Sequence, residues 1–130
     1  VMDRLLLLSA AEITAVPTFL QEAAITALET DPAPMVNVYR QRRDYVCRRL
    51  DEMGISYPDP EGAFYVFPNI SHLGLPSEEL CIRMIKEGGV AAVPGSCFGG
   101  EGHIRLSYCY SDEELSQALD RLEAFLKVLQ

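Results

Sequence analysis

The chain has 130 residues, a length that fits one domain and can bury a modest core without disulfides or a metal. Hydrophobic residues make up 48% and charged residues 23%, the balance of an ordinary soluble globular protein. The formal net charge of −8 disfavours nucleic-acid binding, because that class needs a basic surface to displace counterions.

Targeting signals are the next class to consider. The apolar run Leu5–Leu8 follows Met2–Arg4, but Ser9 and Glu12 interrupt it too early for a signal peptide. No stretch approaches the length of a membrane span. The chain begins with Val1 instead of methionine, which favours a fragment or an engineered boundary.

The cysteines are widely spaced and form no CxxC pair, so neither a zinc site nor a redox motif is predicted. We expect four buried thiols in a reducing, cytoplasmic compartment. They are Cys47, Cys81, Cys97 and Cys109.

The first 34 residues predict two helices. The first runs from Asp3, a candidate N-cap, to about Ile13. Residues Thr18 to Gln21 have the form of a capping box, and apolar residues then recur on one helical face. These residues are Leu20, Ala23, Ala24, Ala27 and Leu28. Because residues 31–34 break the pattern, we predict a helical segment at 1–34, apart from residues 35–130.

A long helix is predicted from Met35 to Met53, with Gly54 as its C-cap. Its apolar stripe consists of Tyr39, Val46, Leu50 and Met53. The only basic cluster of the chain lies mostly off this stripe and consists of Arg40, Arg42, Arg43, Arg48 and Arg49. We expect a solvated helix face on which these arginines pair with Asp44, Asp51 and Glu52.

The remaining residues alternate short strands with helices. Strands are predicted at 63–67, 90–93 and 103–109, with loops at 68–76 and 94–102. Ser77 is expected to cap a helix that ends near Glu87. Ser111 opens the last helix through a capping box with Glu114, and leucines recur along one face of that helix. They are Leu115, Leu119, Leu122, Leu126 and Leu129.

This order predicts an α/β domain of two layers. A small mixed or antiparallel sheet of about three strands is expected, covered on one face by helices.

The strand at 103–109 contains the candidate for chemistry. Its residues alternate strictly, so Ile104, Leu106 and Tyr108 face one way and Arg105 and Ser107 the other. The apolar side must pack beneath helices, which leaves Arg105 in mid-strand on the opposite face. Its guanidinium suits bidentate binding of a carboxylate. The alternative, which spacing alone favours, is a surface arginine on an open sheet.

Three segments occur in a fixed order, namely Gly62–Ile70 (GAFYVFPNI), Val90–Gly99 (VAAVPGSCFG) and His103–Tyr108 (HIRLSY). They resemble the C-terminal part of class I/II aminotransferases, which have the aspartate aminotransferase fold. The segment Val16–Ala24 also resembles the part of that family that follows the cofactor region. The resemblance covers essentially the whole chain.

The resemblance implies roles for individual residues. The family's last-strand arginine binds the substrate α-carboxylate, and Arg105 matches it within Ile104-Arg105-Leu106-Ser107. The aromatic residue of the family's Gly-Ala-Phe motif lies near the substrate, and Phe64 matches it. The loop Pro94–Phe98 is expected near the active-site entrance, where turn formation and substrate proximity explain its residues equally well.

The family also needs a lysine that binds pyridoxal 5'-phosphate covalently, and here the sequence departs from it. Lys86 and Lys127 are the only lysines, and neither lies in a matching motif. The aspartate that pairs with the pyridine nitrogen and the phosphate-binding groups are expected upstream as well. The resemblance therefore implies a chain without catalytic, cofactor-binding or metal-binding residues, which is inactive alone.

In this interpretation, residues 1–34 link to a missing cofactor-binding large domain and residues 35–130 form the small domain. The implied enzyme transfers an amino group between an amino acid and a 2-oxo acid. It is expected to be a cytoplasmic homodimer without nucleic-acid or membrane partners.

Two alternatives stay open. One is a stand-alone α/β module that binds small acidic ligands and regulates a partner. The other is a fragment of a lyase or decarboxylase of the same fold and cofactor. Other sites are not indicated: His72 and His103 lack metal-ligand spacing, residues 99–102 do not form a P-loop, and Ser96 is not in a G-x-S-x-G elbow.

Overall fold

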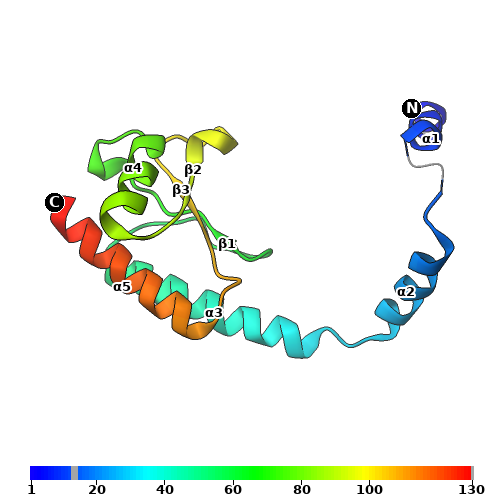
Figure 1. Ribbon diagram of the computed structural model, residues 1–130, viewed down its shortest axis with the longest axis horizontal. Coiled ribbons are helices and arrows are strands. Elements are labelled where there is room, and N and C mark those ends of the chain that lie inside the picture. Colours follow the sequence, from blue (N-terminus) through cyan, green and yellow to red (C-terminus); the bar gives the residue numbers. More distant parts are fainter. Residues whose placement is uncertain (13–14, 130) are drawn as a thin grey trace. The chain divides into compact units, whose positions relative to one another are not determined.

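The computed structural model describes residues 1–12 and 15–129, which divide into two compact units, Val1–Pro34 and Met35–Gln130 (Figure 1). The first unit contains α1 (Met2–Glu12) and α2 (Thr18–Glu29), and neither helix has a buried residue. The predicted end of the first helix at Ile13 lies outside the described residues.

The start of α2 differs from the prediction. Thr18 is the first helical residue, and the N-cap is Pro17, which makes no side-chain cap hydrogen bond. The predicted capping box is therefore wrong. Gln21 instead reaches back, and its Nε2 donates to the carbonyl of Val16 at 2.8 Å. Proline fits this place because its fixed φ suits the entry to a helix.

The second unit contains the sheet and the larger helices (Figure 1). Its predicted elements are present, although the strands are shorter than expected. In chain order they are α3 (Ala33–Glu52), β1 (Tyr65–Val66), η1 (Ser71–Leu73), α4 (Ser77–Arg83), η2 (Met84–Gly88), β2 (Val93–Pro94), η3 (Gly95–Phe98), β3 (Ile104–Ser107) and α5 (Asp112–Leu129). A turn of 3-10 helix, η3, replaces the first part of the predicted loop at 94–102.

The sheet has the order β1-β3-β2, and both pairings are antiparallel. In register, Tyr65 lies opposite Ser107, and Val93 lies opposite Arg105. The last strand in sequence is thus the central one. The predicted small sheet of three strands in an α/β fold is confirmed.

The core lies between the sheet and the helices. Side chains of the strands and of α3, α4 and α5 form one buried cluster. Its fully buried members include Leu50, Val66, Leu80, Met84, Ile104 and Leu122. Burying each such side chain contributes roughly 1.5–3 kcal/mol to the stability of the fold. This burial determines which face of the sheet packs against the helices.

Two predicted helix ends are confirmed. Gly54 follows α3 with a φ of +72°, a left-handed conformation that glycine adopts without strain. At the start of α5, the Glu114 backbone N–H donates to Ser111 Oγ at 3.3 Å, and the Ser111 N–H donates to Glu114 Oε2 at 3.0 Å. These reciprocal bonds form the expected capping box. The Ser111 hydroxyl, which donates to Glu114 Oε2 at 2.6 Å, and the Ser111 N–H together lower the pKa of Glu114.

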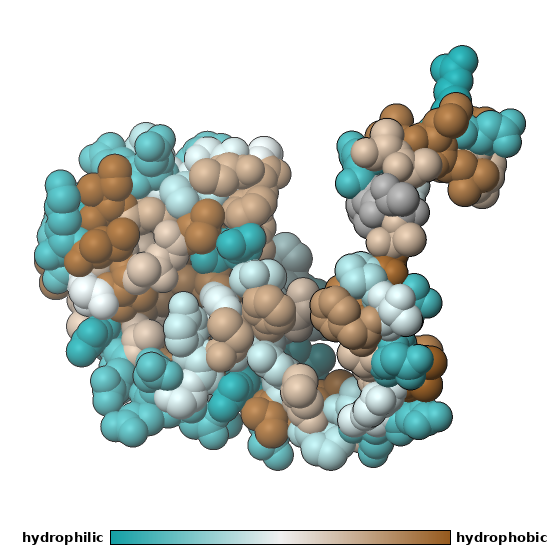
Figure 2. Space-filling model, turned by 45° about the vertical axis from the view of Figure 1, so that its right-hand side comes forward, coloured by the Kyte–Doolittle hydropathy of each residue, from teal (hydrophilic) through white to brown (hydrophobic). Residues whose placement is uncertain are grey.

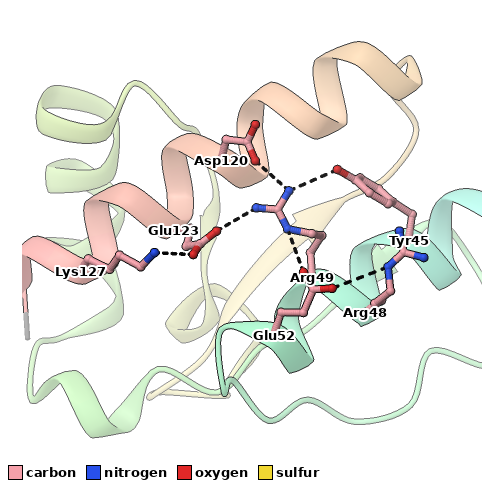
Figure 3. Close-up of polar contacts among 7 residues, drawn as sticks. All are labelled: Tyr45, Arg48, Arg49, Glu52, Asp120, Glu123 and Lys127. Carbon is pink, nitrogen blue, oxygen red and sulfur yellow. Dashed lines mark hydrogen bonds and ion pairs between the residues drawn. The ribbon is translucent and has the colours of Figure 1, made fainter.

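The basic cluster of α3 is only partly the solvated face that the sequence predicts. Asp44 pairs with Arg43 and Glu52 with Arg48 as expected, whereas Asp51 accepts a hydrogen bond from Tyr57. Arg49 is only 12% exposed, because it lies against α5 and pairs there with Asp120 at 2.8 Å and Glu123 at 3.0 Å (Figure 3).

These pairs, with Arg42–Asp112 at 2.8 Å, show that α3 and α5 run side by side in the same direction. Burial by itself would lower the pKa of Arg49. Hydrogen bonds with Tyr45, Asp120 and Glu123 outweigh this effect, so that the pKa is raised overall.

The expectation of four buried thiols is wrong for two of them. Cys81 is buried and Cys47 is half-buried, whereas Cys97 and Cys109 are exposed. Cys109 follows the end of β3 and Cys97 lies in the short 3-10 turn η3, so the periodicity of a long helix or strand does not govern their burial. Burial raises the pKa of Cys81 to about 11.

Within the described ranges, no helix combines the length and apolar character that crossing a membrane requires.

Candidate functional site

Arg105 lies on the face of the sheet that the core leaves open. Along β3, Ile104 and Leu106 are buried, whereas Arg105 and Ser107 are partly exposed. Tyr108, the next residue in this alternation, is buried again. The predicted alternation is therefore confirmed, and Arg105 projects from mid-strand away from the buried cluster.

The guanidinium of Arg105 lies against two aromatic rings. Its Cζ is 4.3 Å from the ring centroid of Tyr65 and 4.5 Å from that of Phe98. Tyr65 belongs to the neighbouring strand β1 and Phe98 to η3, so separate parts of the chain build this contact. Cation–π contacts of this kind hold a guanidinium in place without neutralising its charge.

Arg105 has no carboxylate as an ion-pair partner within the described part of the chain. Among the described residues, the aromatic rings of Tyr65 and Phe98 are therefore what contacts the charged group of Arg105. The N–H groups of such a guanidinium are available to an anionic ligand, and their fork geometry matches a carboxylate.

Phe64 precedes β1 and is 38% exposed. Its ring centroid lies 4.4 Å from that of Tyr65 and 6.2 Å from that of Tyr39. The preceding residue, Ala63, has a φ of +58°, which costs an alanine about 1–2 kcal/mol. Buried Tyr108 anchors this bend, because its hydroxyl donates to the Ala63 carbonyl at 3.2 Å and its N–H to the Phe64 carbonyl at 3.0 Å.

Both predicted site residues, Arg105 and Phe64, line one pocket of about 610 Å³. Tyr65, Ser107 and Tyr110 also line it. This volume lies within the range of small-molecule sites, and the lining combines apolar surface with the guanidinium groups of Arg105 and Arg121 and the carboxylate of Glu114. The structure therefore brings together the two residues that the sequence singled out.

The loop after β2 is packed closely against the start of β3. The Gly95 N–H donates to the His103 carbonyl at 2.8 Å, and the Gly100 N–H donates to the Gly95 carbonyl at 3.0 Å. A Cβ at Gly95 would collide with both the Gly100 and the His103 carbonyl oxygens, so only glycine fits there. This packing brings η3, and with it Phe98, next to the sheet.

Glu101 ties the same loop to α4. Ser77 donates to its carboxylate twice, from N–H to Oε1 at 2.6 Å and from Oγ to Oε2 at 3.0 Å. These two bonds, followed by one from the Gly102 N–H, lower the pKa of Glu101. The predicted Ser77 cap is therefore wrong, because the capping carboxylate comes from 24 residues further along the chain.

Covalent cofactor binding needs a lysine, and neither lysine of the chain lines this pocket. Lys127 pairs with Glu123 on α5, and Lys86 lies in η2. The residues described here therefore do not fit pyridoxal phosphate as a complete site. Within those same residues, no group of three potential metal ligands comes together.

Sequence reasoning missed the ring contacts of Arg105. The signal for Tyr65 was present, because β1 and β3 both alternate and neighbouring strands place side chains in register on each face. Phe98 carried no such signal. Its position depends on how the loop folds back, and nothing local to Phe98 encodes this.

The class I and II aminotransferase family model matches residues 1–122. The chain is 46% identical to aromatic-amino-acid aminotransferase 2 of Thermococcus litoralis over 85% of this chain and 30% of that protein. It is 44% identical to an aspartate aminotransferase of Pyrococcus abyssi, over the same shares of each.

Solved structures agree. The aromatic aminotransferase of Pyrococcus horikoshii matches with a TM-score of 0.88 at 41% identity, covering 97% of this chain and 36% of that one. The aspartate aminotransferase of Thermotoga maritima matches with a TM-score of 0.86 at 39% identity, covering 92% and 31%.

The α/β fold and these matches define a chain of the aminotransferase fold. The chain belongs to the class I and II aminotransferase family. It spans about 30% of the length of the curated relatives that it matches.

Proposed function

We propose that the chain is the C-terminal small-domain part of a pyridoxal-phosphate-dependent aminotransferase, in which Arg105 binds the substrate α-carboxylate. The observation that carries this proposal is the Arg105 guanidinium, which lines a pocket together with Phe64 and has no carboxylate partner in the described chain. The relatives are named for aromatic and aspartate substrates, and the α-carboxylate is a group that these amino acids share.

In this proposal, Arg105 acts by orienting the substrate. Two parallel N–H···O bonds hold a carboxylate in the plane of the guanidinium, which fixes the direction of the substrate Cα. Tyr65 and Phe98 restrict the guanidinium, so less freedom is lost when substrate binds. Phe64, at the pocket wall, contributes apolar surface that limits water around the bound substrate.

Pyridoxal 5'-phosphate, when bound, carries the amino group between the two half-reactions. We assign its binding, and the lysine that moves the substrate proton, to a large domain outside this chain. The substrates are then an amino acid and a 2-oxo acid, and the intact enzyme is a homodimer in the cytoplasm.

Exposed apolar side chains on the first unit support the assignment of a large domain outside this chain. Its helices present exposed leucines at positions 5–8, and Leu7 is 72% exposed. Phe19, Ile25 and Leu28 are also exposed on α2. Figure 2 shows hydrophobic side chains on the surface of these helices. We propose that this surface packs against the large domain or a second subunit, because such patches mark interaction sites.

The reaction is tested on the intact protein with a ¹⁵N-labelled amino acid and an unlabelled 2-oxo acid. The expected result is ¹⁵N in a new amino acid that corresponds to the oxo acid. Release of ¹⁵N-ammonia would indicate a lyase, and release of carbon dioxide would indicate a decarboxylase. A protein without a cofactor absorption band would favour the stand-alone ligand-binding module instead.

A further inference from the structure

Glu101 joins the start of β3 to α4, which lies 24 residues earlier in the chain, and to η3. Its carboxylate accepts both hydrogen bonds of Ser77, the first residue of α4. Ser77 is fully buried. Its Oγ also accepts a hydrogen bond from the Ser96 N–H at 3.3 Å. One carboxylate is thereby connected, through one buried hydroxyl, to both α4 and η3.

The far end of this connection is Arg105. Ser96 lies two residues before Phe98 in η3, and the Phe98 ring is 4.5 Å from the Arg105 Cζ. Glu101 itself lies just before β3, the strand that carries Arg105. Glu101 therefore fixes the η3 turn from both sides, through Ser77 and through its own short link to β3.

We propose that Glu101 is a positioning residue. Through Ser77 and Ser96 it holds the Phe98 ring against Arg105, and so sets the orientation in which the guanidinium receives a carboxylate. This inference rests on the proposed function of Arg105. Glu101 touches neither the pocket nor Arg105, so it acts only through the residues that it holds.

A purely structural explanation makes a different prediction. If Glu101 only capped α4, its loss would destabilise that short helix and leave Arg105 unchanged. Glu78 offers a matched control, because it lies in the first turn of the same helix and is exposed. Removing its charge weakens the favourable charge at the helix terminus but leaves the hydrogen bonds of Ser77 and Ser96 in place.

The first experiment is NMR of the 130-residue chain. The side-chain Nε–Hε signal of Arg105, assigned from its absence in Arg105→Lys, reports the nearby rings. Glu101→Ala is expected to move this signal toward that of a free arginine, whereas Glu78→Ala leaves it in place. An unchanged Arg105 signal in folded Glu101→Ala overturns the inference. If that variant does not fold, Ser77→Ala takes its place under the same criterion, because it removes only the hydroxyl link.

The second experiment is steady-state kinetics of the intact enzyme. Glu101→Ala and Phe98→Leu are each expected to raise KM for amino acids by about two- to thirtyfold, which is the range of a cation–π contact, with kcat within about twofold of the wild type. Because both act on the same contact, the double variant is expected to be no worse than Phe98→Leu alone. Additive effects contradict the inference.

The two proposals fail in different ways. If Arg105→Ala leaves kcat/KM unchanged, the proposed function is wrong, whatever Glu101 does to the NMR signal. If Arg105→Ala lowers kcat/KM while Glu101→Ala changes neither KM nor the Arg105 signal, only the positioning role is wrong.

Discussion

At the scale of single residues, Arg105 is the side chain whose replacement tests the proposed function most directly. Arg105→Ala in the intact enzyme should lower kcat/KM for every amino acid and oxo acid. Losing one partner of a buried charge pair costs roughly 2–5 kcal/mol, which corresponds to about one and a half to several orders of magnitude. Steady-state kinetics on two chemically different amino donors measures this loss.

Arg105→Lys should recover only part of the activity, because an ammonium cannot make two parallel hydrogen bonds to one carboxylate. The cofactor absorption spectrum serves as the control and should be unchanged in both variants. A loss confined to acidic substrates would show that Arg105 binds a side-chain carboxylate instead of the α-carboxylate.

At the scale of elements, Arg49 is the main polar link between α3 and α5 (Figure 3). Arg49→Met keeps an unbranched apolar stem but removes the guanidinium and with it the bonds to Asp120, Glu123 and Tyr45. We expect the free energy of unfolding to fall by about 1.5–3 kcal/mol, the range for hydrogen bonds to charged groups. Urea denaturation measures it.

The matched control is Arg48→Met on the same helix. Arg48 is 65% exposed and lies 3.9 Å from Glu52, so its loss should cost at most about 1 kcal/mol. Equal effects of the two variants would mean that α3 and α5 are held together by apolar packing alone.

The helix caps of the second unit also predict how its stability changes at acidic pH. Hydrogen bonds from Ser111 lower the pKa of Glu114, and hydrogen bonds from Ser77 lower that of Glu101. A carboxyl whose pKa is lowered on folding stabilises the fold above its unfolded pKa, and this stability is lost as the pH falls through the folded pKa. Unfolding should therefore become easier below the ordinary glutamate value of 4.5.

Ser111→Ala should reduce this acid dependence, because Glu114 then loses the hydroxyl that lowers its pKa. At neutral pH the same change should cost about 1 kcal/mol, a typical value for an N-cap. Thermal unfolding between pH 3 and pH 7 measures both effects. An unchanged pH profile would contradict the role given to this capping box.

Comparing the three predicted serine and threonine caps shows what a sequence can reveal. The Ser111 cap is correct because both partners lie within four residues, so local pattern suffices. The Ser77 cap is wrong because a tertiary contact replaces it: Glu101 approaches only after the loop has folded. The Thr18 cap is wrong because Pro17 is the N-cap and Thr18 is already the first residue of the helix.

The same difference between local patterns and long-range contacts applies to the candidate site. Strand alternation and the family motifs were enough to select Arg105 and Phe64, which do line a common pocket. The contact between Arg105 and Phe98 depends on the backbone packing at Gly95, where backbone groups of Gly95, Gly100 and His103 meet at close range. Interactions of this kind are long-range, and no local pattern encodes them.

At the scale of the whole molecule, the buried cluster lies entirely within the second unit. A chain shortened to residues 31–130 should therefore fold alone and be monomeric, and it keeps the Asp31 side chain that binds the Ala33 N–H. The 130-residue chain should self-associate through the exposed leucines of α1. Size-exclusion chromatography with light scattering, alongside NMR spectra of both chains, compares them.

Two results would count against this division of the molecule. An unfolded 31–130 chain would mean that the first unit is required for the core. A strictly monomeric 130-residue chain with α1 protected from hydrogen exchange would mean that its leucines are not an unfilled docking surface.

The 130-residue chain should also fail to bind pyridoxal phosphate covalently. Lys86 and Lys127 both lie outside the pocket lined by Arg105. Borohydride reduction followed by peptide mass spectrometry should find no stoichiometric adduct. A single, saturating adduct at either lysine would place a complete cofactor site in this chain and overturn the proposed division of labour.

The central position of β3 has a consequence for synthesis on the ribosome. Among the described residues, β1 and β2 pair only with β3, and β3 is the last of these strands to be made. Neither earlier strand has a partner in the sheet until residues 104–107 leave the exit tunnel, so the nascent chain exposes the unpaired edges of β1, and then also those of β2, until β3 emerges. A premature stop before β3 therefore releases a polypeptide with unpaired strands that is prone to aggregation, whereas a stop within α5 releases one in which all three strands can pair.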